Sequence, residues 1–132
     1  MDARRECPVD SKRVLVADDD DGVCALLAAV LAPLCRITTV HDAASALELV
    51  AHEPYDAIIS DYMLPDLDGL EFVARVRRDR ECARTPILMI SGHEVSERAL
   101  EAGVDAFLDK PFTLAQLRAA VGELLASAAR SS

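Results

Sequence analysis

The sequence predicts an α/β fold, in which five parallel strands form a doubly wound sheet with helices on both faces. Short apolar runs alternate along the chain with segments of helical periodicity, and the links between them are short. Most of the runs are continuous rather than alternating in polarity, which suits strands that are buried on both faces and are usually parallel. Alternating strand and helix units in such a sheet need right-handed crossovers, which place helices on both faces.

Five segments are predicted to be strands. Four are continuous apolar runs, and the fifth, RITTV, is less apolar but rich in β-branched residues, which predicts a strand toward the sheet edge. The predicted strands cover residues 14–17, 36–40, 57–60, 87–90 and 106–108.

Five helices are predicted to follow these strands. Asp42 is a predicted N-cap, Gly103 ends the fourth helix, and Thr113 with Gln116 three residues later forms a capping box. The predicted helices cover residues 23–32, 43–51, 70–78, 95–102 and 114–126.

The composition predicts one domain, covering residues 13–126, between an N-terminal tail (1–12) and a C-terminal tail (127–132). A chain of 132 residues buries an ordinary core without disulfides or metals. The net charge of -9 argues against nucleic-acid binding, because a phosphate backbone needs a basic face. Four scattered cysteines are predicted to be reduced thiols, which favours a cytoplasmic location. No membrane span is predicted, because the longest apolar stretch has 12 residues and is broken by Pro33.

Chemically reactive side chains follow several of the predicted strands. Ligands of open parallel sheets bind beyond the carboxyl ends of the strands. Carboxylate oxygens at that edge suit a hard divalent cation, and a lysine with a hydroxyl suits a phosphoryl group. The residues at these strand ends are Asp18, Asp19, Asp61, Ser91, Asp109 and Lys110.

Four longer motifs give the chain a family resemblance. They are LVADDD, IISDYMLPDLDGLEF, ILMISG and GVDAFLDKPF, in this order along the chain. Each motif is weak alone, but their joint order and spacing are specific. Over residues 13–126 the chain resembles the receiver domain of bacterial two-component response regulators, including chemotaxis regulators. The resemblance implies the flavodoxin-like (βα)5 fold with strand order 2-1-3-4-5.

The resemblance also implies how the site works. Asp61 is then the phosphoacceptor, which takes a phosphoryl group from the histidine of a sensor histidine kinase or a histidine phosphotransferase. Asp19 binds Mg²⁺ directly, Asp18 acts through a water, and the main-chain carbonyl of Met63 completes the protein ligands. Lys110 contacts the acceptor carboxylate and the phosphoryl oxygens, and the bond to the following proline is commonly cis. The run of four acids, residues 18–21, is then tolerated because a dication and a lysine offset its repulsion.

A second set of residues is implied to transmit the signal. The Ser91 hydroxyl turns to the phosphoryl group, and Phe107 moves inward with it. Phe107 stands where tyrosine is more common, so its coupling works by ring packing without a phenolic hydrogen bond. Met63 and His93 are candidates for setting the lifetime of the phosphate. The face made by the fourth helix, fifth strand and fifth helix is expected to bind a downstream protein, with a homodimer as one possibility.

Several residues have simpler structural interpretations. Acids favour the first turn of a helix, and Ser or Asp favours an N-cap. On this basis Asp20 and Asp21 start a helix, and Ser91 forms a capping box with Glu94. Asp66 and Asp68 form a turn and cap the third helix. The exposed face of the third helix is then formed by Arg75, Arg77, Arg78 and Arg80.

Three functions are compatible with the sequence. The first is a phosphorylatable signalling module that is not an enzyme, apart from self-phosphorylation and self-dephosphorylation at Asp61. The second is a Mg²⁺-dependent phosphohydrolase of the haloacid dehalogenase type, although its second acid, two residues after the nucleophile, is replaced here by Met63. The third is a non-phosphorylated interaction module, although such modules usually lack an acid or the lysine. A stand-alone receiver and a piece of a larger regulator or hybrid kinase both fit.

Overall fold

A computed structural model describes residues 12–92 and 103–131, with only the backbone for residues 127–131. Its five strands form one all-parallel sheet in the order β2-β1-β3-β4-β5, which confirms the predicted fold class and strand order. The weaker run RITTV forms an edge strand, as predicted. Each predicted strand agrees with the structure to within one residue at either end. The strands are β1 (Arg13–Ala17), β2 (Arg36–Val40), β3 (Ala57–Asp61), β4 (Ile87–Ser91) and β5 (Ala106–Asp109).

Four of the predicted helices lie in the described residues, and the predicted helix 95–102 lies outside them. The first begins two residues earlier than predicted, because the Asp20 carboxylate accepts hydrogen bonds from the amides of Gly22 and Val23. The last continues five residues beyond its predicted end at residue 126. The helices are α2 (Asp21–Leu31), α3 (Ala43–His52), α4 (Gly69–Arg78) and α6 (Leu114–Ser131).

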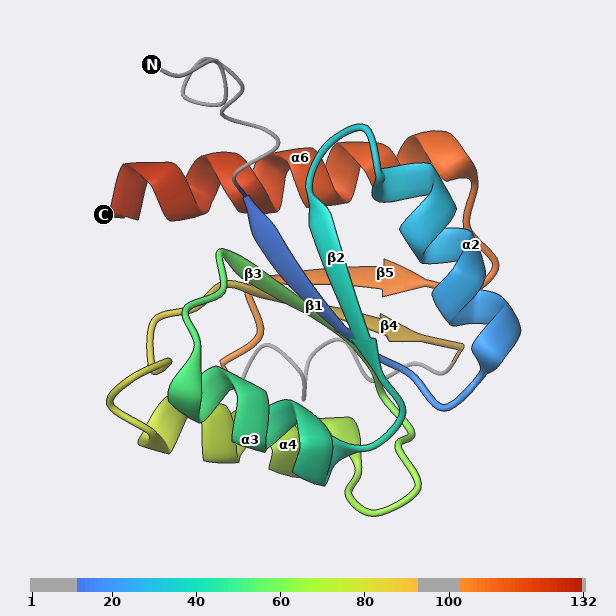
Figure 1. Ribbon diagram of the computed structural model, residues 1–132. Helices are drawn as coiled ribbons and strands as arrows, with labels where there is room; N and C mark the ends of the chain where they lie inside the picture. The colour runs from blue at the N-terminus through green and yellow to red at the C-terminus, as the bar shows by residue number, and fades with distance from the viewer. Residues whose placement is uncertain (1–11, 93–102, 132) are drawn as a thin grey trace.

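The helices form a layer on each face of the sheet (Figure 1). The side chains of Val14 and Val16 belong to a core with residues of α2 and α6. Those of Leu15 and Ala17 belong to a second core with residues of α3 and α4. Successive side chains of a strand point to opposite faces, so β1 must be apolar at every position to serve both cores.

Two of the predicted helix caps are confirmed. The Asp42 carboxylate accepts a hydrogen bond from the Ser45 amide at the start of α3. At the start of α6, the Thr113 amide donates to the Gln116 side chain, and the Gln116 amide donates to the Thr113 hydroxyl.

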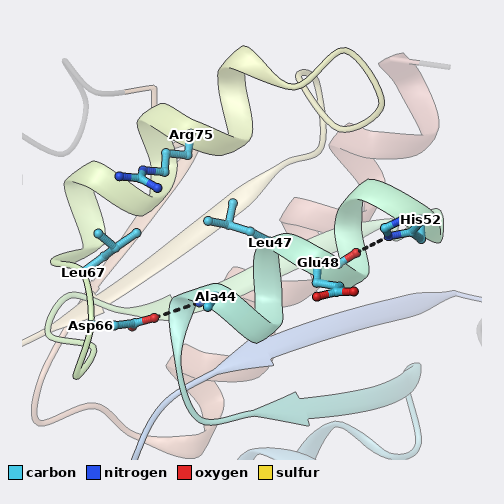
Figure 2. Close-up of a pocket in the computed structure, with 7 residues that line it drawn as sticks. All are labelled: Ala44, Leu47, Glu48, His52, Asp66, Leu67 and Arg75. Atoms are coloured by element: carbon cyan, nitrogen blue, oxygen red, sulfur yellow. Dashed lines mark hydrogen bonds between the residues drawn. The ribbon is translucent and has the colours of Figure 1, made fainter.

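The prediction for the β3–α4 loop is half right. Asp68 caps α4, because its carboxylate accepts from the Glu71 amide. Asp66 does not cap α4. Its carboxylate instead accepts from the amides of Ala43 and Ala44 at the start of α3, because the loop folds over that helix end (Figure 2).

The exposed face predicted for α4 is wrong at Arg77. Only 22% of this side chain is exposed, because the segment after α4 and the turn before β5 fold around its guanidinium group. Arg75 and Arg78 are exposed, as predicted, and both contact the Glu71 carboxylate.

The described part of the chain contains three cysteines. Cys24, Cys35 and Cys82 are free and buried within it, which agrees with the predicted reduced thiols. Burial raises the pKa of Cys35 and Cys82 to about 11, so both stay protonated at neutral pH.

None of the helices in the described residues is long and apolar enough to cross a bilayer.

Candidate functional site

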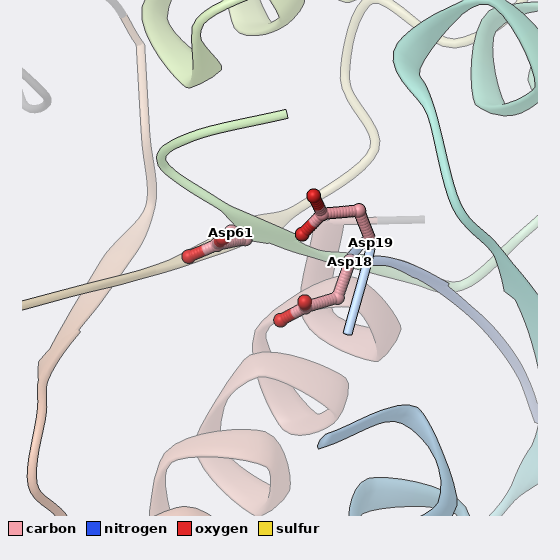
Figure 3. Close-up of side chains that lie close together, drawn as sticks. All are labelled: Asp18, Asp19 and Asp61. Atoms are coloured by element: carbon pink, nitrogen blue, oxygen red, sulfur yellow. The ribbon is translucent and has the colours of Figure 1, made fainter. Parts of the chain in front are cut away.

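Three carboxylates meet at the carboxyl edge of the sheet. Asp18 and Asp19 follow β1, and Asp61 ends β3, which pairs directly with β1. One carboxylate oxygen from each residue lies within 4.8 Å of the others (Figure 3). The parallel register Ala17↔Ser60 brings these two strand ends to the same level, so residues more than 40 positions apart share one site.

Asp18 is the most buried member of the cluster. Only 3% of the residue is exposed, and its backbone amide donates to the Val40 carbonyl on β2. One of its carboxylate oxygens accepts from the Asp20 amide at 2.9 Å. Burial, and then the neighbouring charges of Asp61 and Asp19, raise the pKa of Asp18, although the Asp20 hydrogen bond and Lys110 oppose the change. Burial and the neighbouring acids therefore both disfavour the charged form of Asp18.

Lys110 approaches the cluster from the end of β5. Its ammonium nitrogen lies 3.4 Å from an Asp61 carboxylate oxygen. Its backbone amide donates to the Ser91 carbonyl at 2.8 Å, which ties the ends of β4 and β5 together. The Lys110–Pro111 bond is cis, as the family resemblance implied.

The predicted switch residues occupy two different places. Ser91 ends β4 and is 1% exposed, one position beyond Ile90, the β4 partner of Asp61. Phe107 lies in β5, half-buried against the core shared by α3 and α4. His93 lies outside the described residues. The functions assigned to these residues stay predictions.

Met63 lies in the β3–α4 loop, with 56% of the residue exposed. Its backbone pairs with that of Asp68 in an isolated antiparallel bridge. The hydrogen bond of this bridge runs from the Gly69 amide to the Tyr62 carbonyl, so it does not use the carbonyl of Met63. This geometry is compatible with the predicted use of that carbonyl as a metal ligand.

The donor set fits a small hard dication such as Mg²⁺. Mg²⁺ prefers oxygen ligands at about 2.0–2.1 Å, so oxygens on opposite sides of the ion are about 4.2 Å apart. The carboxylate oxygens of Asp18, Asp19 and Asp61 lie close enough together to share one ion after small rotations. A dication would also stabilise the charged form of Asp18, which burial and, to a smaller extent, Asp61 and Asp19 disfavour.

The local sequence did not indicate three further contacts around this site. The Cys24 thiol on α2 donates to the Asp18 carbonyl at 3.2 Å. The His41 ring lies 2.9 Å from the Asp21 carboxylate. Asp66 contacts α3 rather than α4. Each contact joins different elements of the fold, so no helical or strand periodicity could have predicted it.

This fold and site define a class of protein: doubly wound α/β domains that gather carboxylates and a lysine at the carboxyl edge of a parallel sheet. Residues 14–122 match the family model described as the response regulator receiver domain. The chain therefore belongs to the response regulator receiver domain family, a family of signalling modules in two-component systems. The matched residues lie within the predicted domain of residues 13–126, whose limits stay a prediction.

Two mycobacterial proteins are among its similar relatives. The transcriptional regulatory protein TcrA of Mycobacterium tuberculosis is 40% identical over 113 residues, which cover 83% of this chain and 44% of that protein. The response regulator MprA of Mycobacterium ulcerans is 40% identical over 119 residues, which cover 87% of this chain and 50% of that protein. The chain thus spans about half the length of these relatives.

Solved receiver domains have the same fold. The receiver domain of the sensor histidine kinase PA1611 of Pseudomonas aeruginosa has a TM-score of 0.80 at 28% identity, covering 88% of this chain and 98% of that one. That structure holds a magnesium ion in its active-site cleft. A response regulator of Chloroflexus aurantiacus has a TM-score of 0.83 at 32% identity, covering 89% of this chain and 99% of that one.

Proposed function

We propose that Asp61 accepts a phosphoryl group, with Mg²⁺ bound, from the phosphohistidine of a sensor histidine kinase or a histidine phosphotransferase. The observation that carries the proposal is the convergence of Asp18, Asp19, Asp61 and Lys110 at one edge of the sheet. Three carboxylates alone would repel a phosphoryl group. A dication together with one lysine brings the formal charge of the three carboxylates to zero, which removes the repulsion of an anionic donor.

In the proposed reaction, a carboxylate oxygen of Asp61 attacks the phosphorus atom of the donor. A new oxygen–phosphorus bond forms, the nitrogen–phosphorus bond breaks, and the imidazole of the donor histidine leaves with the bonding electrons. Lys110 stabilises the negative charge on Asp61 and on the transferred oxygens, because its ammonium group already lies beside the acceptor. Asp19, Asp61 and the Met63 carbonyl would hold the ion directly and Asp18 through a water, and the bound ion would supply positive charge to the phosphoryl oxygens.

The response is proposed to spread from Ser91 and Phe107. The Ser91 hydroxyl contacts the phosphoryl group, and Phe107 moves inward and changes the face made by residues 95–102, β5 and α6. Residues 95–102 lie outside the described part of the chain. A downstream protein, or a second copy of this domain, binds that face in the cytoplasm, while Met63 and His93 influence how long the phosphate lasts.

The two rival functions have less support. A haloacid dehalogenase-type phosphohydrolase needs a second acid two residues after its nucleophile, and Met63 occupies that position. An interaction module without phosphorylation would have no need of three converging acids and a lysine, and all four residues are present here.

Intact-protein mass spectrometry after incubation with Mg²⁺ and acetyl phosphate tests the proposal. One phosphoryl adduct is expected in the wild type, and none in Asp61→Asn or in an EDTA control. Asp66→Asn is not a suitable control, because that residue lies in the adjoining loop. Asp56→Asn is suitable, because Asp56 lies before β3 and contacts Arg13 at the opposite edge of the sheet.

A domain that ignores small donors or rapidly loses phosphate would give no adduct, so a second experiment is needed. A beryllofluoride complex mimics the phosphoryl group without transfer, and NMR shifts at Asp61 and Lys110 would report its binding. Binding in the wild type but not in Asp61→Asn would support the proposal. No adduct and no beryllofluoride binding would instead favour the interaction module.

A further inference from the structure

We propose that Asp66 is a positioning residue for the cation site, because it tethers the loop that carries Met63 to the start of α3. This inference rests on the proposed function, in which the Met63 carbonyl is a metal ligand. Asp66 itself touches none of the three clustered carboxylates. It acts on the site through the backbone of its own loop.

The tether consists of two hydrogen bonds to neighbouring amides. One Asp66 carboxylate oxygen accepts from the Ala43 amide at 2.9 Å, and the other accepts from the Ala44 amide at 2.9 Å. Figure 2 shows the side chain reaching from the loop to the helix start. The Asp42 carboxylate takes the next amide, that of Ser45, at 2.7 Å. Two aspartates from separate parts of the chain therefore share the amide donors that the first turn of α3 leaves unpaired.

The start of α3 is a firm attachment point. Ala43 and Ala46 are completely buried and Val50 nearly so, all in the core beneath α3 and α4. The tether also persists at neutral pH, because its backbone hydrogen bonds lower the pKa of Asp66 and keep the carboxylate charged. A charged acceptor at a helix N-terminus is further favoured by the helix dipole.

The rest of the loop is held less completely. Its base is closed by the bond from the Gly69 amide to the Tyr62 carbonyl, and Leu64 is buried. Its tip borders an open groove of about 510 Å³ between α3 and α4, lined in part by Leu47, Leu67 and Arg75. The groove leaves part of the tip uncovered. Leu67 packs against the core beneath α3 and α4, and the two hydrogen bonds of Asp66 join the tip to the backbone of α3.

The position of this loop matters because Mg²⁺ is strict about geometry. Ligand distances near 2.0–2.1 Å and an almost ideal octahedron leave little room for a shifted carbonyl. Met63 is three residues from Asp66 in the same short loop, so movement at the tip changes the direction of its backbone. Loss of a hydrogen-bonded partner behind a metal ligand commonly weakens binding by about 10- to 100-fold. We expect about threefold or more here, because the Met63 carbonyl is one ligand of several.

The test is Mg²⁺ titration by calorimetry of the wild type, Asp66→Ala and two matched controls. Asp42→Ala removes a cap from the same helix but leaves the loop attached, so it should lower Tm and leave Mg²⁺ affinity unchanged. Asp68→Asn removes the same charge from the same loop but still caps α4, since Asn is an equally good N-cap. Asp66→Ala should weaken Mg²⁺ binding by about threefold or more relative to both controls.

Amide exchange provides a readout that does not depend on the metal. In Asp66→Ala without Mg²⁺, exchange of the Ala43 and Ala44 amides should accelerate, while that of Ser45 should change less. If Asp66→Ala does not fold, Asp66→Asn preserves the size and one acceptor and should give a smaller effect in the same direction.

The outcomes separate the two proposals. Wild-type affinity in Asp66→Ala, together with loss of binding in Asp19→Asn, would overturn the positioning function of Asp66 and leave the cation site intact. An equal loss of Mg²⁺ affinity in Asp42→Ala and Asp66→Ala would also overturn it, because both effects would then result from destabilisation of α3. No Mg²⁺ binding by the wild type would overturn the cation site, and the inference with it.

Discussion

Charged side chains are paired differently at the carboxyl ends and at the amino ends of the strands. At the carboxyl edge, three carboxylates lie within 4.8 Å of one another, and one lysine stands 3.4 Å from Asp61. At the amino edge of β4 and β5, the Arg77 guanidinium makes five hydrogen bonds, to the carbonyls of Gly103, Ala83 and Thr85 and to the Asp105 carboxylate. A guanidinium has five N–H donors, so each of them has an acceptor here.

This difference separates a charge that is matched within the protein from charges that repel one another. Arg77 joins the end of α4, the segment before β4 and the turn before β5, so its charge is already matched within the protein. The Asp105 carboxylate also accepts from the Ile87 amide, which extends the same network into β4. In the acid cluster, burial first and then the like charges of Asp61 and Asp19 raise the pKa of Asp18. Repulsion there lowers the stability of the free protein and favours binding of a cation.

Loss of Arg77 should give the largest change in stability. Arg77→Met should lower the free energy of unfolding by about 2–4 kcal/mol, because several partly buried carbonyls and one carboxylate lose their donor. Urea denaturation followed by circular dichroism measures it. Arg75→Met is the matched control on the same helix, where an exposed pair with Glu71 contributes less than about 0.5 kcal/mol. Equal losses of unfolding free energy in the two variants would mean that Arg77 stabilises the fold no more than an exposed arginine does. The contrast with the acid cluster would then be wrong.

A smaller loss of stability is expected at Gly69, the first residue of α4, which lies close to Met89 of β4. A Cβ atom there would come within 2.8 Å of the Met89 sulfur and 2.9 Å of the Tyr62 Cα. The Met89 side chain can move, but the Tyr62 backbone cannot move without shifting the loop. Gly69→Ala should therefore cost about 1–3 kcal/mol by thermal denaturation. Gly122→Ala on α6 meets no atom within 4 Å and should instead stabilise by about 0.5–1 kcal/mol.

The same Asp→Asn change should have opposite signs at the two edges. Asp18→Asn should raise the stability of the Mg²⁺-free protein by about 1 kcal/mol, because it removes a buried charge that its neighbours repel while the Asn oxygen still accepts from Asp20. Asp105→Asn should lower it by about 1 kcal/mol, because it removes the charge that pairs with Arg77. Chemical denaturation in EDTA compares the unfolding free energies of the two variants with that of the wild type. A loss of stability in Asp18→Asn would contradict the assignment of the acid cluster as a destabilising element.

The smallest effect is the pH dependence of the Asp66 tether. Hydrogen bonds from the α3 amides lower the pKa of Asp66 below its ordinary value of 3.8. The tether therefore contributes its full stability above pH 3.8 and loses it as the pH falls through the lower pKa of the folded protein. NMR titration of the Asp66 carboxyl should give a midpoint below 3.8, whereas the ordinary value would indicate that the tether is absent in solution.

Local patterns along the chain were sufficient for much of the fold and site. Every strand was predicted to within one residue. Four were marked by an apolar run between polar segments, and β2 by its β-branched residues, and both signals are local to the strand. Asp42 and Thr113 were assigned correctly because a cap and its helix are adjacent in sequence. The acids at the ends of β1 and β3 were predicted to meet because parallel strands end at one edge.

Only the tertiary structure decided the partners of side chains on loops and at helix ends. Asp66 lies two residues before Asp68 and looks like the same kind of cap, yet it binds a helix start 22 residues earlier in the chain. Arg77 falls on the polar side of α4 by periodicity, but a turn 26 residues later covers it. Periodicity records which face a residue occupies on its own helix. It cannot record which other segment covers that face, because packing between distant parts of the chain decides where loops lie.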